Sequence, residues 1–492
     1  MDKKSVIVLG SGFAGMAAAS FLSRDGWDVT VIEKNEGPGG RARQLKENGF
    51  TFDMGPSFYW MPDVFERYFQ SFGRSARDYY TLHRLDPSYR IYWSDGFTDF
   101  PADLQRLKET FESIEPGSAL QLEKFLKEAE TKYRVAMEDM VFKPGLSITE
   151  FFNWKTIRGA LQLDLLNSIK SHISKYFTHP RLRQAMEFPV LFLGALPEQT
   201  PSLYSLMNYA DIVGGTWYPS GGMFSVVEGM YKLAIEQGVK FHFNENVTDL
   251  ECRNARVMRV QTSAGTYQPD AVLSAADYHF TETKLLPAEY RSYDDIYWKR
   301  KVMAPSCLMF YVGLNKKLKR LAHHSLFFDV SFEKHGKEIY KFPCWPSEPL
   351  FYASVSSKSD EQAAPAGHEN LVLLIPVAAG LENDDEAMRE RYFEMIIRRM
   401  EKVTGESIME AVIYKRSYSV SDFRNDYNSF RGNAYGLANT LKQTAIFRPS
   451  CRSRKLRNLF YAGQLTVPGP GVPPSLISGE IAATQLIKVF SK

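Results

Sequence analysis

The chain has 492 residues, which at about 150 residues per domain allows two to four structural units. Hydrophobic residues make up 44% of it and charged residues 24%, as in globular proteins, which excludes a disordered, collagen-like or coiled-coil chain. Lys and Arg number 60 against 57 Asp and Glu, and the two signs are interleaved, so no nucleic acid is expected as a partner. Aromatic residues reach 14%, which suggests wide apolar surfaces inside the fold or facing a ligand.

Cysteine spacing and hydropathy indicate the cellular setting. Four cysteines lie far apart and form no CxxC pair, which favours a reducing, cytoplasmic location: Cys252, Cys307, Cys344 and Cys451. The first apolar run, Val6 to Leu9, is too short for a secretion signal. The longest apolar stretches also fall short of the roughly 20 residues that span a bilayer, so we expect no transmembrane helix, while attachment to a membrane face remains open.

The first forty residues predict a nucleotide-binding unit. Ser5 to Leu9 is a β-branched strand, Gly10 to Gly15 is a GxGxxG turn, and Met16 to Arg24 is a helix rich in small residues. A second strand, Trp27 to Ile32, ends at Glu33. This strand, turn, helix, strand and terminal acid together are typical of a dinucleotide site, whereas the glycine turn alone would be a weak signal.

Each residue type of this motif has a physical task. Gly10 permits a tight turn, Gly12 lets the backbone approach a pyrophosphate at the helix N-terminus, and Gly15 allows the helix to pack closely on the strand. Glu33 accepts hydrogen bonds from a ribose diol and disfavours a 2′-phosphate, which makes NADP the poorer candidate. A second loop, Pro38 to Arg43, combines paired glycines with arginines that suit another phosphate.

These segments carry a family resemblance. Gly10 to Gly15, Glu33, Gly39 to Arg41 and Asp53 to Ser57 resemble the FAD-binding start of the amine oxidase, protoporphyrinogen oxidase and carotenoid desaturase group of flavoproteins. The resemblance implies FAD as the cofactor.

The end of the chain narrows the resemblance. Asn458 to Gln464 reads as a strand entering a glycine turn, a Pro/Gly-rich loop follows to Pro474, and a helix is expected over Ser475 to Val489. This block looks like the C-terminal signature of bacterial and fungal type phytoene desaturases. Further matching blocks span nearly the whole chain, in the family's order, at Gly221–Met230, Asp277, His323–Phe328, Ala364–Glu369 and Asp422–Arg424.

The resemblance implies a set of cofactor-binding residues. They are Gly10, Gly12, Phe13, Ala14, Gly15, Glu33, Lys34, Gly40, Arg41, Gly55, Pro56, Ser57, Val247, Gly463, Gln464, Val472 and Pro473. In the family the position of Val247 brackets the adenine through its backbone, although a plain core valine explains it equally well from sequence. Departures from the family pattern at Gln464–Thr466, Pro473–Pro474 and Tyr59–Pro62 could reshape the substrate tunnel.

The motif positions predict an α/β fold with a discontinuous Rossmann-like FAD-binding domain. We expect this domain to comprise residues 1–100, 221–290 and 445–492. Residues 101–220 form a helical insertion that faces a membrane, and residues 291–444 form a mixed-sheet substrate domain.

By resemblance the protein is an FAD-dependent oxidoreductase acting on CH–CH bonds, a phytoene desaturase working toward lycopene. The reaction passes a hydride to the flavin and releases a proton from the neighbouring carbon. Alternatives within the family are a carotenoid 3,4-desaturase, a carotenoid oxidase or a retinol saturase, and outside enzymology a prenyl-lipid carrier like the Rab GDP dissociation inhibitors.

Several parts of the chemistry stay open in the sequence. No catalytic residue and no metal site can be assigned, and for His323–His324 we favour one core and one surface histidine, because neighbours in an extended segment point to opposite sides. A second GxGxxG is missing, which favours oxygen or a quinone as electron acceptor over NAD(P)H.

The expected substrate is a long apolar carotenoid, so the enzyme should sit as a peripheral protein on the inner face of the cytoplasmic membrane. Transfer of about forty carbons into water costs on the order of 30 kcal/mol at about 0.8 kcal/mol per CH₂. A candidate membrane contact is Leu146 to Phe177, where aromatic and aliphatic residues mix with lysine and arginine. An ordinary amphipathic helix packed on the core is at least as good an interpretation.

Overall fold

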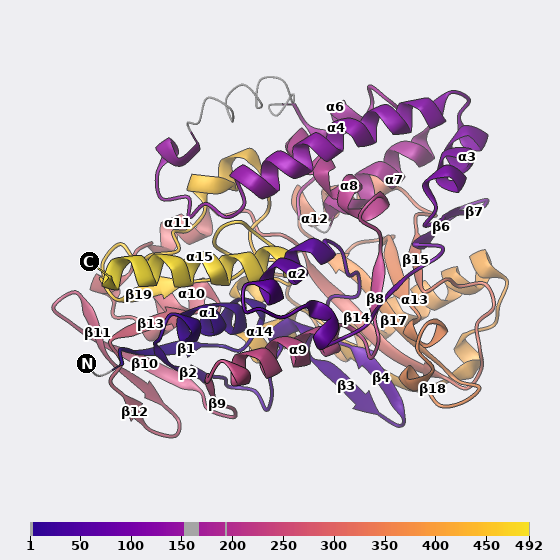
Figure 1. Cartoon of the computed structure of the whole chain (residues 1–492). Coiled ribbons are helices and arrows are strands. Elements are labelled where there is room, and N and C mark those ends of the chain that lie inside the picture. The colour runs from indigo at the N-terminus through magenta and orange to yellow at the C-terminus, as the bar shows by residue number, and fades with distance from the viewer. Residues whose placement is uncertain (1–2, 152–166, 192–193, 492) are drawn as a thin grey trace.

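The computed structural model describes residues 3–151, 167–191 and 194–491. Two large sheets lie side by side in the lower part of the view in Figure 1, and a group of helices lies above them. The predicted α/β class is confirmed.

A five-stranded parallel sheet contains the predicted nucleotide-binding strands. Its order is β19-β13-β1-β2-β9, with every neighbouring pair parallel. The strands are β1 (Ser5–Leu9), β2 (Asp28–Ile32), β9 (Lys240–His242), β13 (Ala271–Ser274) and β19 (Leu459–Tyr461). They come from the three stretches predicted to form one discontinuous domain. Residues 271–274 are buried throughout, because both faces of a parallel sheet are covered.

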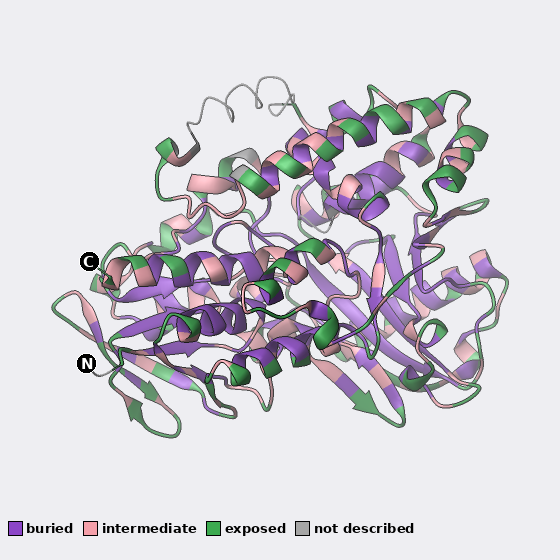
Figure 2. Ribbon diagram, viewed as in Figure 1, coloured by how far each residue is buried: buried purple, intermediate pink, exposed green. Residues whose placement is uncertain are grey.

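Three helices accompany this sheet, namely α1 (Phe13–Arg24), α9 (Met223–Glu236) and α15 (Val472–Phe490). α1 packs against both others, and its first ten residues are buried, so it is largely purple in Figure 2. Close approach depends on Gly479 of α15, since a Cβ there would lie 2.3 Å from the carbonyl oxygen of Ala14. Gly479 therefore lies in the contact between α15 and α1. The helix begins at Val472, three residues before the predicted Ser475.

A seven-stranded mixed sheet forms the second part, in the order β18-β14-β17-β16-β15-β6-β7. Only β15 and β6 pair in parallel among its described neighbours. The strands are β6 (Tyr89–Trp93), β7 (Gly96–Phe100), β14 (Ser306–Leu314), β15 (His324–Phe327), β16 (Phe351–Ser354), β17 (Glu369–Val377) and β18 (Val412–Tyr418). β6 and β7 fall inside the predicted segment 1–100 but belong to this sheet, so here the structure differs from the predicted boundary. The residue pattern within a strand does not indicate which sheet that strand joins.

Residues 101–220 are the segment that is predicted as a helical insertion. It contains α3 (Leu104–Ile114), α4 (Ser118–Asp139), α6 (Ile169–Ile173), α7 (Pro180–Leu191) and α8 (Leu206–Ile212). Of the proposed membrane contact, residues 152–166 lie outside the described residues. Ile169, Ile173 and Phe177 at its end are fully buried and pack in the core, whereas Leu146 at its start is 41% exposed. The three buried residues support the alternative interpretation of an ordinary amphipathic helix packed on the core.

The remaining elements are short. Small sheets pair β3 (Gln44–Glu47) with β4 (Phe50–Asp53), β5 (Leu82–Arg84) with β8 (Trp217–Pro219), and β10 (Val247–Arg253) with β11 (Arg256–Thr262) and β12 (Thr266–Tyr267). The other helices are α2 (Pro62–Gln70), α10 (Tyr278–Phe280), α11 (Asp295–Lys299), α12 (Phe332–Tyr340), α13 (Glu386–Thr404) and α14 (Val420–Tyr427). Within the described ranges, no helix combines the length and the apolarity that a membrane span needs.

Candidate active site

One cavity lies where the carboxyl ends of β1, β2, β13 and β19 meet residues of the second sheet. Ligands of open parallel sheets bind at this edge, because the loops that follow the strands converge there. All the residues predicted to bind the cofactor line this cavity except Gly15. The assignment of each to FAD stays a prediction, but the fold brings them together from both ends of the chain.

The turn between β1 and α1 is built from backbone contacts. Gly10 has a φ of +93°, in the region that favours glycine, and a Cβ on Gly15 would lie 1.9 Å from the carbonyl oxygen of Gly10. Gly15 therefore packs the helix on the turn instead of lining the cavity. Gly12, the N-cap of α1, offers no side-chain acceptor, and the first turn holds no acidic residue. The amide groups of this helix end are available to an anion.

Glu33 ends β2 and is held rigidly at the cavity. One carboxylate oxygen accepts from the Ser11 amide at 2.9 Å and from the Ser11 hydroxyl at 3.0 Å. The other accepts from the backbone amide and the side-chain amide of Asn35, both at 2.9 Å. Only 6% of Glu33 is exposed. The carboxylate is thus oriented before any ribose hydroxyl reaches it.

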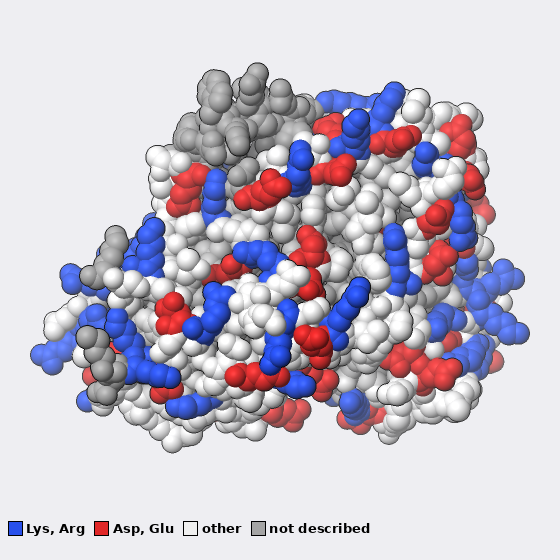
Figure 3. All heavy atoms as spheres, in the orientation of Figure 1, with Lys and Arg blue, Asp and Glu red and all other residues white. Residues whose placement is uncertain are grey.

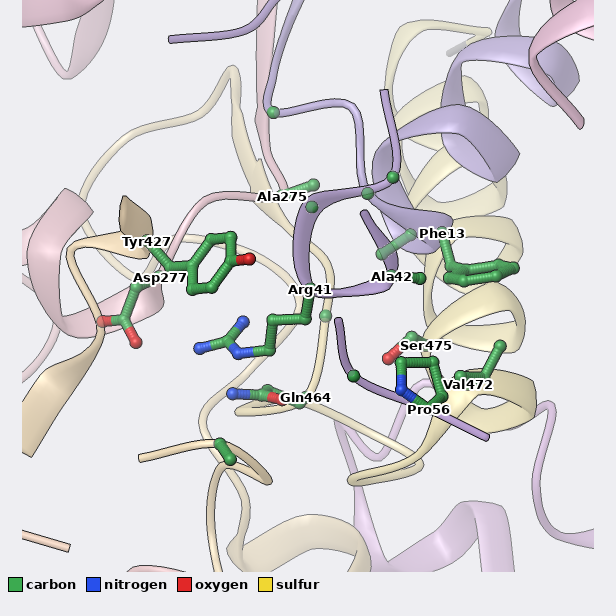
Figure 4. A pocket seen from close by; sticks show the side chains of 18 of the residues that line it. Phe13, Arg41, Ala42, Pro56, Ala275, Asp277, Tyr427, Gln464, Val472 and Ser475 are labelled. Carbon is green, nitrogen blue, oxygen red and sulfur yellow. The ribbon is translucent and has the colours of Figure 1, made fainter. Parts of the chain in front are cut away.

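Arg41 reaches from the glycine loop toward α14 and the loop after it (Figure 4). Its guanidinium donates to the Ser429 hydroxyl at 3.2 Å and to the Asn433 carbonyl at 3.4 Å, and lies 5.2 Å from the ring centroid of Tyr427. Burial lowers the pKa of Arg41, an effect that the nearby Asp277 carboxylate opposes. Its Nε is buried and has no hydrogen-bond partner among the described residues.

The C-terminal loop closes another side of the cavity. α15 begins at Val472, so Pro473 and Pro474 occupy its first turn and provide no amide hydrogen. Val472 therefore supplies the one free amide among the first three helical positions. The helical Ser478 hydroxyl accepts from the Gly463 amide at 2.9 Å, which ties the start of the loop to the helix.

Arg448 holds this loop and was not identified from sequence. It is 3% exposed and donates to the carbonyls of Gln464 at 3.2 Å and Leu437 at 3.1 Å. Burial lowers its pKa to about 10. It stands in no motif, so only its position in the fold reveals it.

Beyond these residues the cavity continues between apolar side chains, most of which sequence reasoning missed. They are Phe58, Trp60, Met61, Met207, Cys307, Met309, Leu374, Phe423 and Tyr435, joined by the phenol of Tyr352. Most follow no motif, and the second sheet supplies several of them. Of the bulky run noted after Ser57, Trp60 and Met61 line the cavity, whereas Tyr59 stacks on Phe65 in the core.

The prediction for the paired histidines is wrong. His323 is 6% exposed and His324 is fully buried, so neither lies at the surface. Adjacent strand residues do point to opposite faces, but helices and loops cover both faces of this sheet, as Figure 2 shows by the purple of its strands.

Comparison with known proteins gives consistent results. Residues 13–487 match the family described as flavin-containing amine oxidoreductases. Over 490 residues the chain is 40% identical to a carotenoid 3,4-desaturase of Haloarcula japonica, covering 99% of each protein. It is 31% identical to a zeta-carotene-forming phytoene desaturase of Myxococcus xanthus, over 98% of this chain and 94% of that protein.

The fold is likewise similar to solved structures. An oxidoreductase from Methanosarcina mazei aligns with a TM-score of 0.63 at 14% identity, over 99% of this chain and 100% of that one.

The cavity fits FAD on two observations. A Cβ built on Gly12 meets no atom within 4 Å, so the space over the turn is an open cradle beside free amides. The orphaned Nε of Arg41 is a buried donor without a partner in the described chain, as a site prepared for an anionic or carbonyl group requires. Gly12, Glu33 and Arg41 would therefore hold the dinucleotide.

We predict opposite outcomes for two glycine substitutions in the turn. Gly12→Val should give a folded protein without bound flavin, because its extended backbone accepts valine while the side chain fills the cradle. Gly15→Val should instead lower stability by about 2 kcal/mol or more, since its Cβ meets the Gly10 carbonyl. Flavin absorbance and the thermal midpoint measure both effects. A yellow Gly12→Val protein would contradict the placement.

Glu33→Gln should weaken FAD binding by roughly 10- to 100-fold, because one charge-assisted hydrogen bond contributes about 1.5–3 kcal/mol. Glu33→Arg should release FAD more completely, since it also removes the acceptor oxygens. Glu36→Gln, an exposed glutamate three residues further, is the matched control. The measurement is flavin retention during dialysis, and equal retention in Glu33→Gln and Glu36→Gln would argue against the ribose role.

Proposed function

The chain belongs to the flavin-containing amine oxidoreductase family and is a carotenoid desaturase with FAD as cofactor, and we propose that it desaturates the 3,4 bond near the end of an acyclic carotenoid. The observation that carries this proposal is the identity of 40% to a carotenoid 3,4-desaturase along 99% of both proteins. The cavity supports it, because an apolar extension continues from the residues that suit the flavin.

The bound FAD supplies two-electron oxidation by accepting a hydride from the substrate carbon. The chain supplies orientation and a dry environment. Trp60 is fixed by a hydrogen bond of 2.8 Å from its indole nitrogen to the Thr216 hydroxyl, which sets the position of one wall. Thr216 in turn donates to the buried carboxylate of Asp211 at 2.9 Å. Burial raises the pKa of Asp211 to about 7. A rigid apolar wall aligns the reacting bond and excludes water.

Phytoene desaturation toward lycopene is the second candidate, supported by the identity of 31% to a phytoene desaturase. The two activities differ in how far a linear chain advances past the flavin, and both use the same cofactor site. A carotenoid oxidase or retinol saturase activity would need a substrate with a different end group. Against a lipid carrier without chemistry stands the combination of the glycine turn with the oriented Glu33 carboxylate, because a protein that binds no dinucleotide has no use for both.

We further propose that the enzyme works as a peripheral protein at the inner face of the cytoplasmic membrane and passes its electrons to oxygen or a quinone. All four cysteines are free thiols, as a reducing compartment favours.

A surface around α11 is suited to lipid contact. Three large apolar side chains are exposed there, Ile296 by 58%, Val302 by 43% and Phe447 by 57%. Lys301 joins two of the segments, because its ammonium donates to the Phe447 carbonyl at 3.3 Å. Arg300 and Lys442 line the same hollow as Ile296 and Val302. Exposed apolar side chains surrounded by lysine and arginine are suited to a bilayer surface with anionic headgroups. We call Ile296, Arg300, Lys301, Val302, Lys442 and Phe447 the α11 surface.

The substrate proposal is tested by product analysis. The purified holoenzyme is incubated in air with liposomes that contain either phytoene or an acyclic carotenoid already conjugated up to its saturated 3,4 bond. We expect a bathochromic shift with the second substrate and little change with phytoene. Conversion of phytoene alone would replace the 3,4 proposal by the phytoene reaction, and conversion of neither would sink both.

The same assay tests the electron acceptor. Turnover should stop without oxygen and return when a quinone is added. A strict requirement for NAD would contradict the proposal.

Membrane contact is tested by liposome co-sedimentation. The triple variant Ile296→Ser, Val302→Ser and Phe447→Ser should bind anionic vesicles roughly 10-fold or more weakly, since each side chain contributes about 1 kcal/mol of apolar transfer. The matched control changes Met258, Phe342 and Ile413 to serine, which are exposed by 44%, 64% and 52% outside the α11 surface. Equal binding of both triple variants would place membrane contact elsewhere.

A further inference from the structure

We infer that Tyr352 is a catalytic residue that takes up the proton leaving the substrate carbon, and that His324 is a positioning residue that receives the phenol's own proton. This inference rests on the proposed function, because it concerns the proton released when a carbon–carbon bond is desaturated. The structure places Tyr352 in the lining of the cavity, and His324 contacts it from behind.

Strand pairing brings the two residues together. β15 and β16 are antiparallel neighbours, with His324 opposite Ser354 and Leu326 opposite Tyr352. His324 and Tyr352 are therefore diagonal neighbours on one face of the second sheet. Their hydrogen bond joins the imidazole Nδ1 to the phenol Oη at 2.6 Å.

Tyr352 connects this pair to the cavity. It lines the cavity together with Ser57 and Phe58. Its phenol donates to the Ser57 hydroxyl at 2.9 Å, and the same oxygen lies 2.6 Å from the His324 Nδ1. The single phenol hydrogen turns from Ser57 to His324 when the relay operates, because a hydroxyl rotates freely about its C–O bond. Burial raises the pKa of Tyr352, which keeps the phenol neutral and able to both give and accept a proton.

His324 is fixed and neutral. Its ring stacks on Phe58 with centroids 4.1 Å apart and planes 16° from parallel. Burial lowers the pKa of His324 well below its usual range, and the neighbouring His323 lowers it further. The Nε2 atom is buried and has no hydrogen-bond partner within the described part of the chain. A buried imidazole nitrogen left unpaired is unusual in a purely structural histidine and points to a role in function.

The acids of the cavity are engaged elsewhere. Among the described residues, four carboxylates line the cavity, and each is held by hydrogen bonds near the predicted cofactor residues. Ser11 and Asn35 hold Glu33, Thr262 and Tyr267 hold Glu245, the amides of Phe280 and Phe430 hold Asp277, and Tyr418 and Arg43 hold Asp426. Tyr352, in contrast, forms its hydrogen bond with the neutral imidazole of His324. It is therefore the best-placed proton acceptor at the apolar end.

As the hydride leaves one carbon, the C–H bond of the neighbouring carbon breaks and its electron pair becomes the second bond of the alkene. The freed proton goes to the Tyr352 Oη while the phenol proton passes to the His324 Nδ1, leaving a neutral phenol and an imidazolium. Hydride loss makes the carbon proton strongly acidic, so an imidazole of lowered pKa is basic enough to accept it. The proton returns along the same chain to Ser57 and leaves with product release.

The decisive experiment measures flavin reduction in a single turnover, without oxygen, on the holoenzyme mixed with carotenoid-loaded liposomes. Tyr352→Phe should slow reduction by roughly 100-fold or more, the usual range for loss of a general base. His324→Asn should slow it by about 10-fold or more, because the amide keeps a hydrogen bond to the phenol but cannot accept a proton. His335→Asn, at a buried histidine that bonds the Pro376 carbonyl and does not line the cavity, is the matched control and should leave the rate within about threefold.

Readouts independent of turnover separate this role from a structural one. FAD content and carotenoid binding should be unchanged in Tyr352→Phe and His324→Asn. In protein labelled with ¹⁵N-histidine, the resonances that disappear in His324→Asn belong to His324. Tyr352→Phe should shift those resonances and leave the resonances of the other histidines unchanged. Unshifted resonances would show that the contact is absent in solution.

The outcomes are distinguishable. Equal reduction rates in wild type and Tyr352→Phe would overturn the inference and leave the proposed function intact, whereas no reduction in wild type would overturn the proposed function itself. If Tyr352→Phe fails to fold, His324→Asn alone decides, and a wild-type rate in that variant would overturn the relay.

Discussion

The contact between Gly15 and the carbonyl of Gly10 is the constraint on which the cofactor site depends. Because a Cβ on Gly15 would lie 1.9 Å from that oxygen, α1 can begin directly above the end of β1 only with glycine at this position. The helix start then leaves its first amides and the open space at Gly12 facing the cavity. The contact of α15 with α1 at Gly479 follows the same principle and places the C-terminal loop opposite the N-terminal turn.

Around this centre, polar contacts close to the cavity join segments that are far apart in the sequence. Asp53, at the end of β4, accepts from the Met223 amide at 2.7 Å and so caps the N-terminus of α9. Burial raises the pKa of this carboxyl to about 6. Arg43 forms a salt bridge with Asp426 of α14. Arg41, two residues earlier, donates to the Ser429 hydroxyl just after that helix. These contacts attach the loop of Gly39 to Arg43 to α14 and to the residues after it, beside the cavity.

Charge on the surface and polarity in the interior serve different purposes in this molecule. On the face drawn in Figure 3, Lys and Arg side chains alternate with Asp and Glu, as the near balance of the composition implies. Inside, polar side chains are few in the apolar extension and are connected to each other, as in the Trp60–Thr216–Asp211 and Ser57–Tyr352–His324 chains. In a low-dielectric environment such connected groups hold definite orientations, which an enzyme acting on a featureless hydrocarbon needs.

The sequence alone determined the elements whose residue types are required locally. The β1–α1 turn, Glu33 at the end of β2, the strand before Gly463 and the C-terminal helix all follow from glycine freedom, strand pattern and the positions of proline. The choice of FAD followed from the resemblance of these motifs to a flavoprotein family. Tertiary structure alone decided which residues from distant segments meet. It assigned β6 and β7 to the second sheet, buried both His323 and His324, and brought Arg448, which stands in no motif, to the carbonyls of the C-terminal loop. The physical reason is that strand partners, sheet coverage and the neighbours of a buried polar atom are set by packing between segments hundreds of residues apart, which no local pattern encodes.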